Sequence, residues 1–228
     1  EDVLKRMTLE EKTRLSYAQG KFSSPGCPRL GIPELWMSDG PHGVRAEINW
    51  NDWGYAGWTS DSCTAFPALT CLAASWNTTL AADYGKAIGE EARYREKDVL
   101  LGPGVNIYRT PLNGRNFEYL GEDPYLAAEL CVPYIQKNGV AACVKHYALN
   151  NQELWRGHID VQLSDRALRE IYLPAFQAAV ERGGVWSIMG AYNKVRGTHA
   201  THHKLLNNDI LKGEWKFDGC VITDWGAA

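Results

Sequence analysis

Val221-Ile222-Thr223-Asp224-Trp225-Gly226, close to the end of the 228-residue chain, is the stretch that decides the fold class. Residues 220–223 form a short apolar, β-branched run, which is typical of a buried strand. The run ends at the carboxylate Asp224, followed by an indole and a glycine. For a lone aspartate, the simplest interpretation is a cap on the following helix. Apolar runs upstream end in the same way, however, and this repetition favours a functional carboxylate fixed at a strand end.

Several other apolar runs lead into polar or charged residues. Predicted strands at 34–37, 99–101, 141–144 and 185–189 are followed by Asp39, Asn106, Lys145-His146 and Tyr192. A further strand is expected over residues 69–73. From the third strand on, strands and helices alternate, which predicts an α/β fold with parallel strands. In a β/α barrel, the carboxyl ends of such strands share one face, where the loops build the site.

Helix start signals separate these strands. Thr8 and Glu11 form a capping-box pattern, which predicts a helix to about residue 19. Asn77, Asp123 and Ser164 are predicted N-caps of helices that end near residues 95, 137 and 182. Asn77 also begins a glycosylation sequon, but we interpret it as a cap. A last helix is expected over residues 202–211.

Residues 46–66 form a predicted loop in the place where a helix would continue the alternation. The loop carries Trp50, Trp53, Tyr55 and Trp58 among Asn, Asp and Gly residues. A long loop of this kind is usually functional or packed over a site. Flat aromatic faces suit the apolar faces of sugar rings, but they also suit a core. The loop is therefore open between a cover over the core and a wall that faces a ligand.

The strand and helix alternation fits both a closed barrel and an open doubly wound sheet. Phosphate-binding patterns of the G-x-G-x-x-G and G-K-[ST] type are absent, and charged residues gather at strand ends, which favours the barrel. About six strands can be counted, whereas a barrel of this type needs eight. We therefore expect an incomplete, TIM-barrel-like (β/α)8 fold, with residues 1–228 as one truncated domain. An unpaired strand edge is expected where further strands would dock.

Composition and residue spacing argue against several classes of function. The formal net charge of −3 gives no reason to expect a nucleic-acid partner. No run approaches 18 uninterrupted apolar residues, so no membrane span is expected. The six cysteines lack zinc-binding spacing and are expected to be buried thiols, with a Cys63–Cys71 pair left open. His199, His202 and His203 lack further ligands at suitable spacing, and neither a metal nor a cofactor is expected.

Five motifs in series resemble those of one enzyme family. They are Ser38-Asp39-Gly40-Pro41-His42-Gly43-Val44-Arg45, Gly114-Arg115-Asn116-Phe117-Glu118 with Gly121-Glu122-Asp123-Pro124, Lys145-His146-Tyr147, Met189-Gly190-Ala191-Tyr192-Asn193 and Val221-Ile222-Thr223-Asp224-Trp225. In their order and spacing they are similar to the N-terminal domain of glycoside hydrolase family 3, and most of all to its bacterial β-glucosidases. The resemblance covers nearly the whole chain.

The resemblance implies a retaining β-glycosidase that releases terminal β-D-glucose from β-glucosides or oligosaccharides. Asp224 would be the nucleophile that forms the covalent glycosyl-enzyme, kept ionised by Lys145 and Arg115. Asp39 would accept hydrogen bonds from the hydroxyls of the sugar. The other implied sugar-binding residues are Arg45, Arg115, Lys145, His146, Arg156, Tyr192 and Trp225.

Two sequence differences narrow the substrate class within the family. Residues 145–151 lack the Lys-His-Phe-Pro-Gly-His-Gly stretch of its N-acetylglucosaminidases, and residues 39–43 differ from the Glu-Ala-Leu-His-Gly of its xylosidases. Both differences point to a glucosidase, with xylosidase and arabinosidase activities open. The family's acid/base Glu usually comes from a second, α/β-sandwich domain, which we do not find in this sequence. We therefore expect little or no turnover from residues 1–228 alone.

Two readings from other functional classes stay open. Lys145 at a strand end could be the amine nucleophile of a Schiff-base lyase. The same ring of polar residues could instead bind glucose without hydrolysing a glucoside. The sequence also leaves open a homo-oligomer, and a periplasmic, secreted or cytoplasmic bacterial location.

Overall fold

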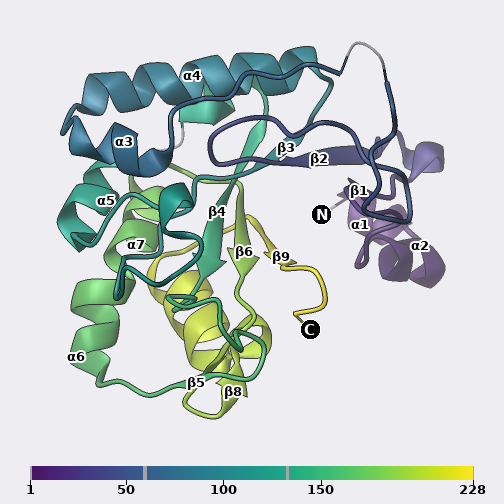
Figure 1. The fold of residues 1–228 in the computed structure, drawn as a ribbon. Coiled ribbons are helices and arrows are strands. Elements are labelled where there is room, and N and C mark those ends of the chain that lie inside the picture. Colours follow the sequence, from purple (N-terminus) through teal and green to yellow (C-terminus); the bar gives the residue numbers. More distant parts are fainter. Residues whose placement is uncertain (1, 59–60, 132–133, 228) are drawn as a thin grey trace.

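The computed structural model describes residues 2–58, 61–131 and 134–227, and a six-stranded sheet lies at its centre (Figure 1). Neighbouring strands run parallel in the order β2 (Leu35–Asp39), β3 (Val99–Leu101), β4 (Ala141–Tyr147), β6 (Ser187–Gly190) and β9 (Cys220–Thr223). The short strand β1 (Ser23–Ser24) pairs antiparallel with β2 at one edge. A second sheet joins β5 (Asp160–Val161), β7 (Lys194–Val195) and β8 (Thr198–His199).

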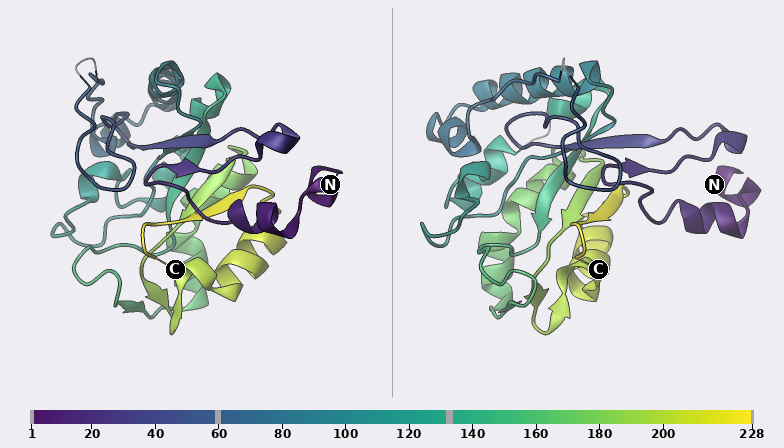
Figure 2. Two further views of the ribbon diagram at one scale, coloured as in Figure 1. Left: turned by 90° about the vertical axis from the view of Figure 1, so that its right-hand side faces the viewer. Right: turned by 45° about the vertical axis from the view of Figure 1, so that its right-hand side comes forward.

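Helices cover one face of the large sheet. This layer contains α3 (Leu69–Ala74), α4 (Thr78–Tyr94), α5 (Pro124–Leu130) and α7 (Pro174–Glu181) (Figure 1). The N-terminal helices α1 (Asp2–Arg6) and α2 (Leu9–Arg14) lie apart from that layer, beside β1 (Figure 2). Shorter or irregular segments are α6 (Asp165–Ala167), η1 (Pro28–Leu30), η2 (Asn116–Glu118), η3 (Tyr134–Asn138), η4 (Leu168–Tyr172), η5 (Ala200–His202) and η6 (Leu205–Glu214).

Side chains on the strands divide between two cores, because successive residues of a strand point to opposite faces. Leu100, Val144 and Ile188 belong to the larger core between sheet and helices. The smaller core on the inner, concave face contains Phe22, Met37, Val99, Leu101, Cys143 and Met189, with Ile222 and Trp225 packed against it. Two residues beyond Met37, Cys143 and Ile222 come Asp39, Lys145 and Asp224. The two-residue period therefore directs all three charged side chains to the inner face.

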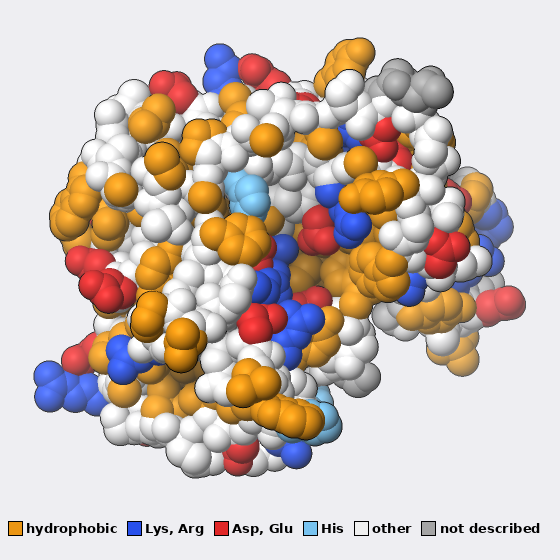
Figure 3. All heavy atoms as spheres, viewed as in Figure 1, with side chains coloured by type: hydrophobic (Ala, Val, Ile, Leu, Met, Phe, Trp, Pro, Cys, Tyr) orange, Lys and Arg blue, Asp and Glu red, His pale blue; other side chains and the backbone are white. Residues whose placement is uncertain are grey.

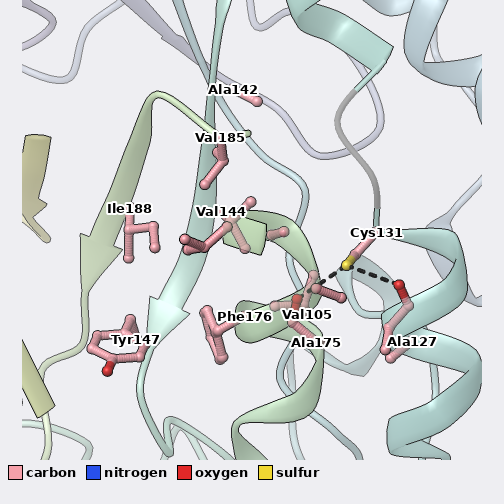
Figure 4. Close-up of a cluster of buried hydrophobic side chains, with 14 of the residues drawn as sticks. Val105, Ala127, Cys131, Ala142, Val144, Tyr147, Ala175, Phe176, Val185 and Ile188 are labelled. Carbon is pink, nitrogen blue, oxygen red and sulfur yellow. Dashed lines mark hydrogen bonds between the residues drawn. The ribbon is translucent and has the colours of Figure 1, made fainter. Parts of the chain in front are cut away.

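The larger core fixes the strands against the helices (Figure 4). Phe176 of α7 packs edge-on against Tyr147 at the end of β4, with ring centroids 5.2 Å apart. The Cys131 thiol donates a hydrogen bond of 3.1 Å to the carbonyl oxygen of Ala175, which ties the end of α5 to α7. Both Phe176 and Tyr147 are fully buried. This packing gives the carboxyl end of β4 a rigid base.

The strand predictions are confirmed with one exception. Residues 69–73, expected to be a strand, belong to helix α3. The buried residues Leu69, Leu72 and Ala73 recur at helical spacing, so the run is amphipathic with a period near 3.6 and not a continuous apolar strand. Strand β1 is not foreseen by the sequence, so the predicted number of about six strands is met in the large sheet by a different set, and the short strands β7 and β8 of the second sheet are not foreseen either.

The predicted N-caps are confirmed. The side chains of Thr8, Asn77, Asp123 and Ser164 each accept a hydrogen bond from a backbone N–H in the first turn of the following helix. Two predicted helix ends are wrong. Helix α2 ends at residue 14, and α5 ends at residue 130 and is followed by η3, with residues 132–133 outside the described part. The helix that begins after Ser164 ends at Glu181, close to the predicted residue 182, but a π-helical turn ahead of Pro174 divides it. The helix expected over residues 202–211 is the π-helical segment η6, which ends later, at Glu214.

The cysteine prediction is confirmed only in part. All six cysteines are free thiols, including Cys63 and Cys71. Cys27, Cys131 and Cys143 are buried, but Cys63, Cys71 and Cys220 are exposed. Cys220 is exposed because β9 is an edge strand with a sheet neighbour, β6, on one side.

The sheet curls as part of a barrel and does not close within the described residues, where β1 and β9 are its two edges. An open cavity of about 900 Å³ lies along the concave side, lined among others by Met37, Val99, Ala141 and Ile222. The predicted α/β, TIM-barrel-like and incomplete fold is confirmed. No helix in residues 2–58, 61–131 or 134–227 combines the length and apolarity needed to cross a bilayer.

Candidate active site

The carboxyl ends of the parallel strands bring the predicted site residues to one face. Asp39 ends β2, Lys145 and His146 lie near the end of β4, and Asp224 follows β9 directly. In a regular strand, neighbours such as Lys145 and His146 would point to opposite faces. The pairing of β4 with β6 is irregular between Val144 and Tyr147, and such an irregularity re-aims side chains. Both residues therefore contact the same cluster of charged groups.

Asp39 forms ion pairs with two cationic side chains. Its Oδ2 lies 3.4 Å from the Arg45 guanidinium, and its Oδ1 lies 3.5 Å from Nζ of Lys145. The Lys145 side chain is 3% exposed, whereas that of Asp39 is 39% exposed. The carboxylate thus balances a buried ammonium group and still presents an open side to a ligand.

His146 is held neutral inside the site. Burial lowers the pKa of His146 well below its usual range, and the nearby Lys145 and Arg115 act in the same direction. The Arg115 Nη2 lies 3.1 Å from Nε2 of His146, and because a guanidinium only donates, Nε2 is the acceptor. The proton therefore resides on Nδ1, which lies 3.0 Å from the hydroxyl of Tyr119. The contact of 3.6 Å between Nε2 and Asp224 Oδ2 is accordingly not an ion pair.

Glu153 links the two arginines of the site. Its Oε2 accepts a hydrogen bond of 2.8 Å from Arg156, and its Oε1 lies 3.9 Å from Nη1 of Arg115. Arg115 also forms an ion pair with the buried Glu118. The two carboxylates fix the guanidinium of Arg115 in direction, while the Arg156 guanidinium stacks 4.2 Å over the ring of Tyr192.

Asp224 is buried and surrounded by cations. Its Oδ1 accepts a hydrogen bond of 2.9 Å from the backbone N–H of Trp225. Burial raises the pKa of Asp224 above its ordinary value, although that hydrogen bond and the charges of Lys145, Arg115 and Arg156 oppose the rise. Desolvation outweighs these charges in the shift, while Lys145 and Arg115 act in the direction expected from the sequence, toward the ionised form. A carboxylate whose pKa is raised by burial is less solvated, and a more reactive base, than a carboxylate in water.

Tyr192 connects Asp224 to the neighbouring backbone. The Tyr192 hydroxyl donates a hydrogen bond of 2.6 Å to the carbonyl oxygen of Trp225. Burial and the negative charge of Asp224 raise the pKa of Tyr192 to about 12, so the phenol stays protonated at neutral pH.

An aromatic wall adjoins the charged cluster. The Trp225 ring lies 5.0 Å from Phe22 and 6.4 Å from Trp53, measured between centroids. The Trp225 indole N–H donates to the carbonyl oxygen of Lys21 at 2.9 Å, which fixes its orientation. Figure 3 shows charged side chains of both signs gathered in a hollow at the centre of this face, with hydrophobic side chains beside them.

All nine residues proposed from the sequence belong to one connected set of contacts around Asp39 and Asp224. Sequence reasoning missed Glu153, Tyr119, Phe22 and the position of Trp53. The spacing of Asn150, Glu153 and Arg156 is a usable signal, since residues three apart in a turn can pair. Within the described residues, no group of three or more His, Cys, Asp or Glu is arranged to hold a metal ion.

Comparisons with known proteins agree with this geometry. The model of the glycosyl hydrolase family 3 N-terminal domain matches residues 12–228. A beta-glucosidase of Bacteroides ovatus, BoGH3A, is 92% identical over 100% of this chain and 31% of its own length. An exo-alpha-(1->6)-L-arabinopyranosidase of Bifidobacterium longum is 43% identical over 98% of the chain and 30% of its own length.

A solved structure shares the fold. Beta-glucosidase 3B of Thermotoga neapolitana, in complex with glucose, superposes with a TM-score of 0.91 at 40% identity, covering 100% of this chain and 34% of that one. The chain therefore spans about a third of the length of the relatives that it matches. With the family model matched from residue 12 to residue 228, the chain belongs to glycosyl hydrolase family 3, in its N-terminal domain.

Proposed function

We propose that this chain carries the nucleophile and the sugar-binding face of a retaining β-glucosidase, with Asp224 as the nucleophile. The buried position of Asp224 at the end of β9, within a ring of cations, is the observation that carries the proposal. Burial removes the water that would otherwise solvate the attacking oxygen, and Lys145, Arg115 and Arg156 favour the ionised form that attacks. The names of the relatives from Bacteroides ovatus and Thermotoga neapolitana support glucose as the sugar.

The residues around Asp224 suit recognition of one sugar ring. Asp39 offers acceptor oxygens, whereas Arg45, Lys145, Arg115 and Arg156 offer donors. Lys145 is buried and the other four groups are partly buried, so a sugar that covers them without pairing leaves polar groups unsatisfied. Such a site discriminates between sugars by the positions of their hydroxyls.

The chemistry that follows takes two displacements at the anomeric carbon. Asp224 forms a bond to that carbon while the bond to the leaving oxygen breaks, and an acid delivers a proton to this oxygen. Water then attacks the anomeric carbon and gives a proton to the conjugate base of that acid, while the bond to Asp224 breaks, which releases the sugar with net retention and restores the Asp224 carboxylate.

The acid needed in the first step is not one of the carboxylates beside Asp224. Asp39 is paired with Arg45 and Lys145, Glu118 with Arg115, and Glu153 with Arg115 and Arg156. A carboxylate whose oxygens serve as the anion of such pairs is a poor proton donor. We propose that the acid comes from outside residues 1–228, which the share of the relatives' length that this chain spans allows.

The same site could also accept glycosides of other sugars. The arabinopyranosidase relative makes an arabinosidase the second candidate, since it needs the same nucleophile and differs in the sugar that fits. A Schiff-base lyase fits less well. The Lys145 ammonium is ion-paired with Asp39, whereas an amine nucleophile must be free and neutral. A binding module without turnover is the remaining alternative.

The test uses a chimera in which residues 1–228 replace the matching segment of the Bacteroides ovatus relative. This protein is treated with a 2-deoxy-2-fluoro-glucosyl inactivator, and its peptides are mapped by mass spectrometry. We expect one glucosyl adduct, on Asp224. The Asp224→Asn variant should lose label and about 10³-fold or more of kcat, whereas Asp218→Asn, at an exposed aspartate of the same segment, should keep both.

Each other outcome has a distinct meaning. An active chimera labelled on another residue removes Asp224 from the role of nucleophile. Glucose binding without turnover supports the binding module, and trapping of Lys145 by borohydride with a carbonyl substrate supports the lyase.

A further inference from the structure

Residues 47–56, within the predicted aromatic loop, form a short hairpin. The backbone N–H of Asn49 donates to the carbonyl oxygen of Gly54 at 2.8 Å, and that of Ala56 donates to Glu47 at 2.9 Å. The Asp52 side chain closes the turn by accepting hydrogen bonds from the Gly54 N–H at 2.7 Å and from the Asn49 amide at 3.0 Å. Trp50 and Trp53 therefore lie on a turn that holds its own shape.

The two tryptophans of this turn have different surroundings. Trp50 packs edge-on against Trp36 of β2, with centroids 5.5 Å apart, and so covers part of that strand. Trp53 turns the other way, to Phe22 at 5.9 Å and to Trp225 at 6.4 Å. The sequence left open whether this loop is a cover or a wall. In the structure Trp50 is part of a cover, and Trp53 is part of a wall.

Trp53 stays accessible after these contacts are made. The residue is 51% exposed, although Phe22 and Trp225 flank it. Its neighbour Trp225 follows the nucleophile directly in sequence, so Trp53 extends the wall outward from the reacting centre. The Arg45 guanidinium, which pairs with Asp39, lies 5.8 Å from the Trp53 ring, and Nζ of Lys21 lies 4.9 Å from it, so this wall adjoins the groups that can read sugar hydroxyls.

We propose that Trp53 forms the outer part of the binding site for the leaving group, as a stacking platform for a second sugar ring or an aryl group. This inference rests on the proposed function, because it presupposes that a glycosidic bond is cleaved at Asp224. A flat apolar face stacks on a ring without reading its hydroxyls, so the platform accepts leaving groups of several kinds. Because the hairpin fixes Trp53 in advance, binding costs little ordering of the loop.

A different role for Trp53 makes a different prediction. The Arg45 guanidinium lies 5.7 Å from the Phe22 ring and 5.8 Å from the Trp53 ring, while it also pairs with Asp39. If Trp53 served only to hold Arg45, its loss would disturb the sugar bound at Asp39. Every substrate would then suffer equally, whatever its leaving group.

The experiment compares leaving groups of different size in the chimera described above. The values of kcat/KM are measured for cellobiose, 4-nitrophenyl β-glucoside and β-glucosyl fluoride, whose leaving group is a single atom. For Trp53→Ala we expect a fall of about 5- to 30-fold for the first two substrates and little change for the fluoride. Trp53→Phe should recover most of the loss, because a ring is restored.

Trp58→Ala is the matched control. Trp58 is 63% exposed on the same loop, but the chain beyond it is tied to α4 through the ion pair of Asp61 with Arg95. We expect it to leave all three values unchanged. An equal loss with all three substrates in Trp53→Ala, or no loss with any, overturns the inference and leaves the proposed function intact. A parent chimera that hydrolyses none of the three overturns both.

Discussion

The hydroxyl of Tyr119 lies 3.0 Å from Nδ1 of His146, at a point where both side chains are buried. Arg115 donates a hydrogen bond to the other ring nitrogen, Nε2. The single N–H of the neutral imidazole is therefore on Nδ1, where it donates to the Tyr119 hydroxyl. The pair fixes both the tautomer and the ring direction of His146. Tyr119 is therefore a positioning residue for the site, although it does not reach Asp39 or Asp224 in any hydrogen bond described.

The first prediction concerns this pair. Tyr119→Phe keeps the ring but leaves Nδ1–H of His146 without an acceptor, which costs about 1–3 kcal/mol at a buried donor. We expect kcat/KM of the chimera for 4-nitrophenyl β-glucoside to fall about 5- to 100-fold. The matched control is Tyr147→Phe, whose hydroxyl also donates to a buried acceptor, the Leu206 carbonyl oxygen at 2.7 Å, but away from the site. If both variants lower activity to the same extent, the loss is one of stability alone.

The second prediction concerns the pH dependence of kcat/KM. The attacking form of Asp224 is ionised, so activity is lost as pH falls through its pKa, which burial raises. The Lys145 charge opposes that rise, and its removal in Lys145→Met should move the acidic limb to higher pH. Lys204→Met, at an exposed lysine paired with Asp209, should leave the limb in place. An acidic limb that moves to lower pH in Lys145→Met would show that another group controls it.

The third prediction concerns the carboxylate that joins two arginines. Glu153→Gln leaves Arg115 and Arg156 without their shared anion, and we expect a loss of about 1–2 kcal/mol in the free energy of unfolding. Because Arg156 loses its carboxylate partner and Arg115 keeps only Glu118, both guanidinium groups are held less firmly, and kcat/KM should fall by about tenfold or more. Glu170→Gln removes a comparable pair with Arg166 on the surface, where the Glu170 side chain is 59% exposed. That control should change neither quantity, as judged by thermal unfolding and steady-state kinetics.

The fourth prediction concerns the start of α4. Asn77 accepts a hydrogen bond of 3.0 Å from the backbone N–H of Leu80, so Asn77→Ala should destabilise the first turn by about 1 kcal/mol. Amide hydrogen exchange of residues 79–82 in the chimera should become faster, while exchange at the core strand β4 stays slow. Asn77→Asp retains the cap and removes the glycosylation sequon. Fast exchange in that variant as well would contradict the role of Asn77 as a cap.

The error over residues 69–73 shows where reading from sequence stops. The run Leu69-Thr70-Cys71-Leu72-Ala73 is short enough to suit either a strand or a helical turn. Packing decides, because Leu69, Leu72 and Ala73 meet the larger core on one helical face. Predictions that rest on local chemistry succeed instead, such as the caps at Asn77 and Asp123, since a side chain and the next turn suffice to form them.

Apart from residues 69–73 and the short strand β1, the sequence by itself determined the order of strands and helices in the large sheet and its helical layer, and it placed Asp39, Lys145 and Asp224 at strand ends. A two-residue period along the strands is enough to turn all three to one face. Only the tertiary structure decided which groups surround them. Glu153 beside Arg115, Tyr119 behind His146 and Trp53 beside Trp225 are contacts between segments far apart in the chain. The tertiary structure also decides the pKa of Asp224, because this pKa depends on how much water the folded chain excludes and on charges brought from β4 and from two loops.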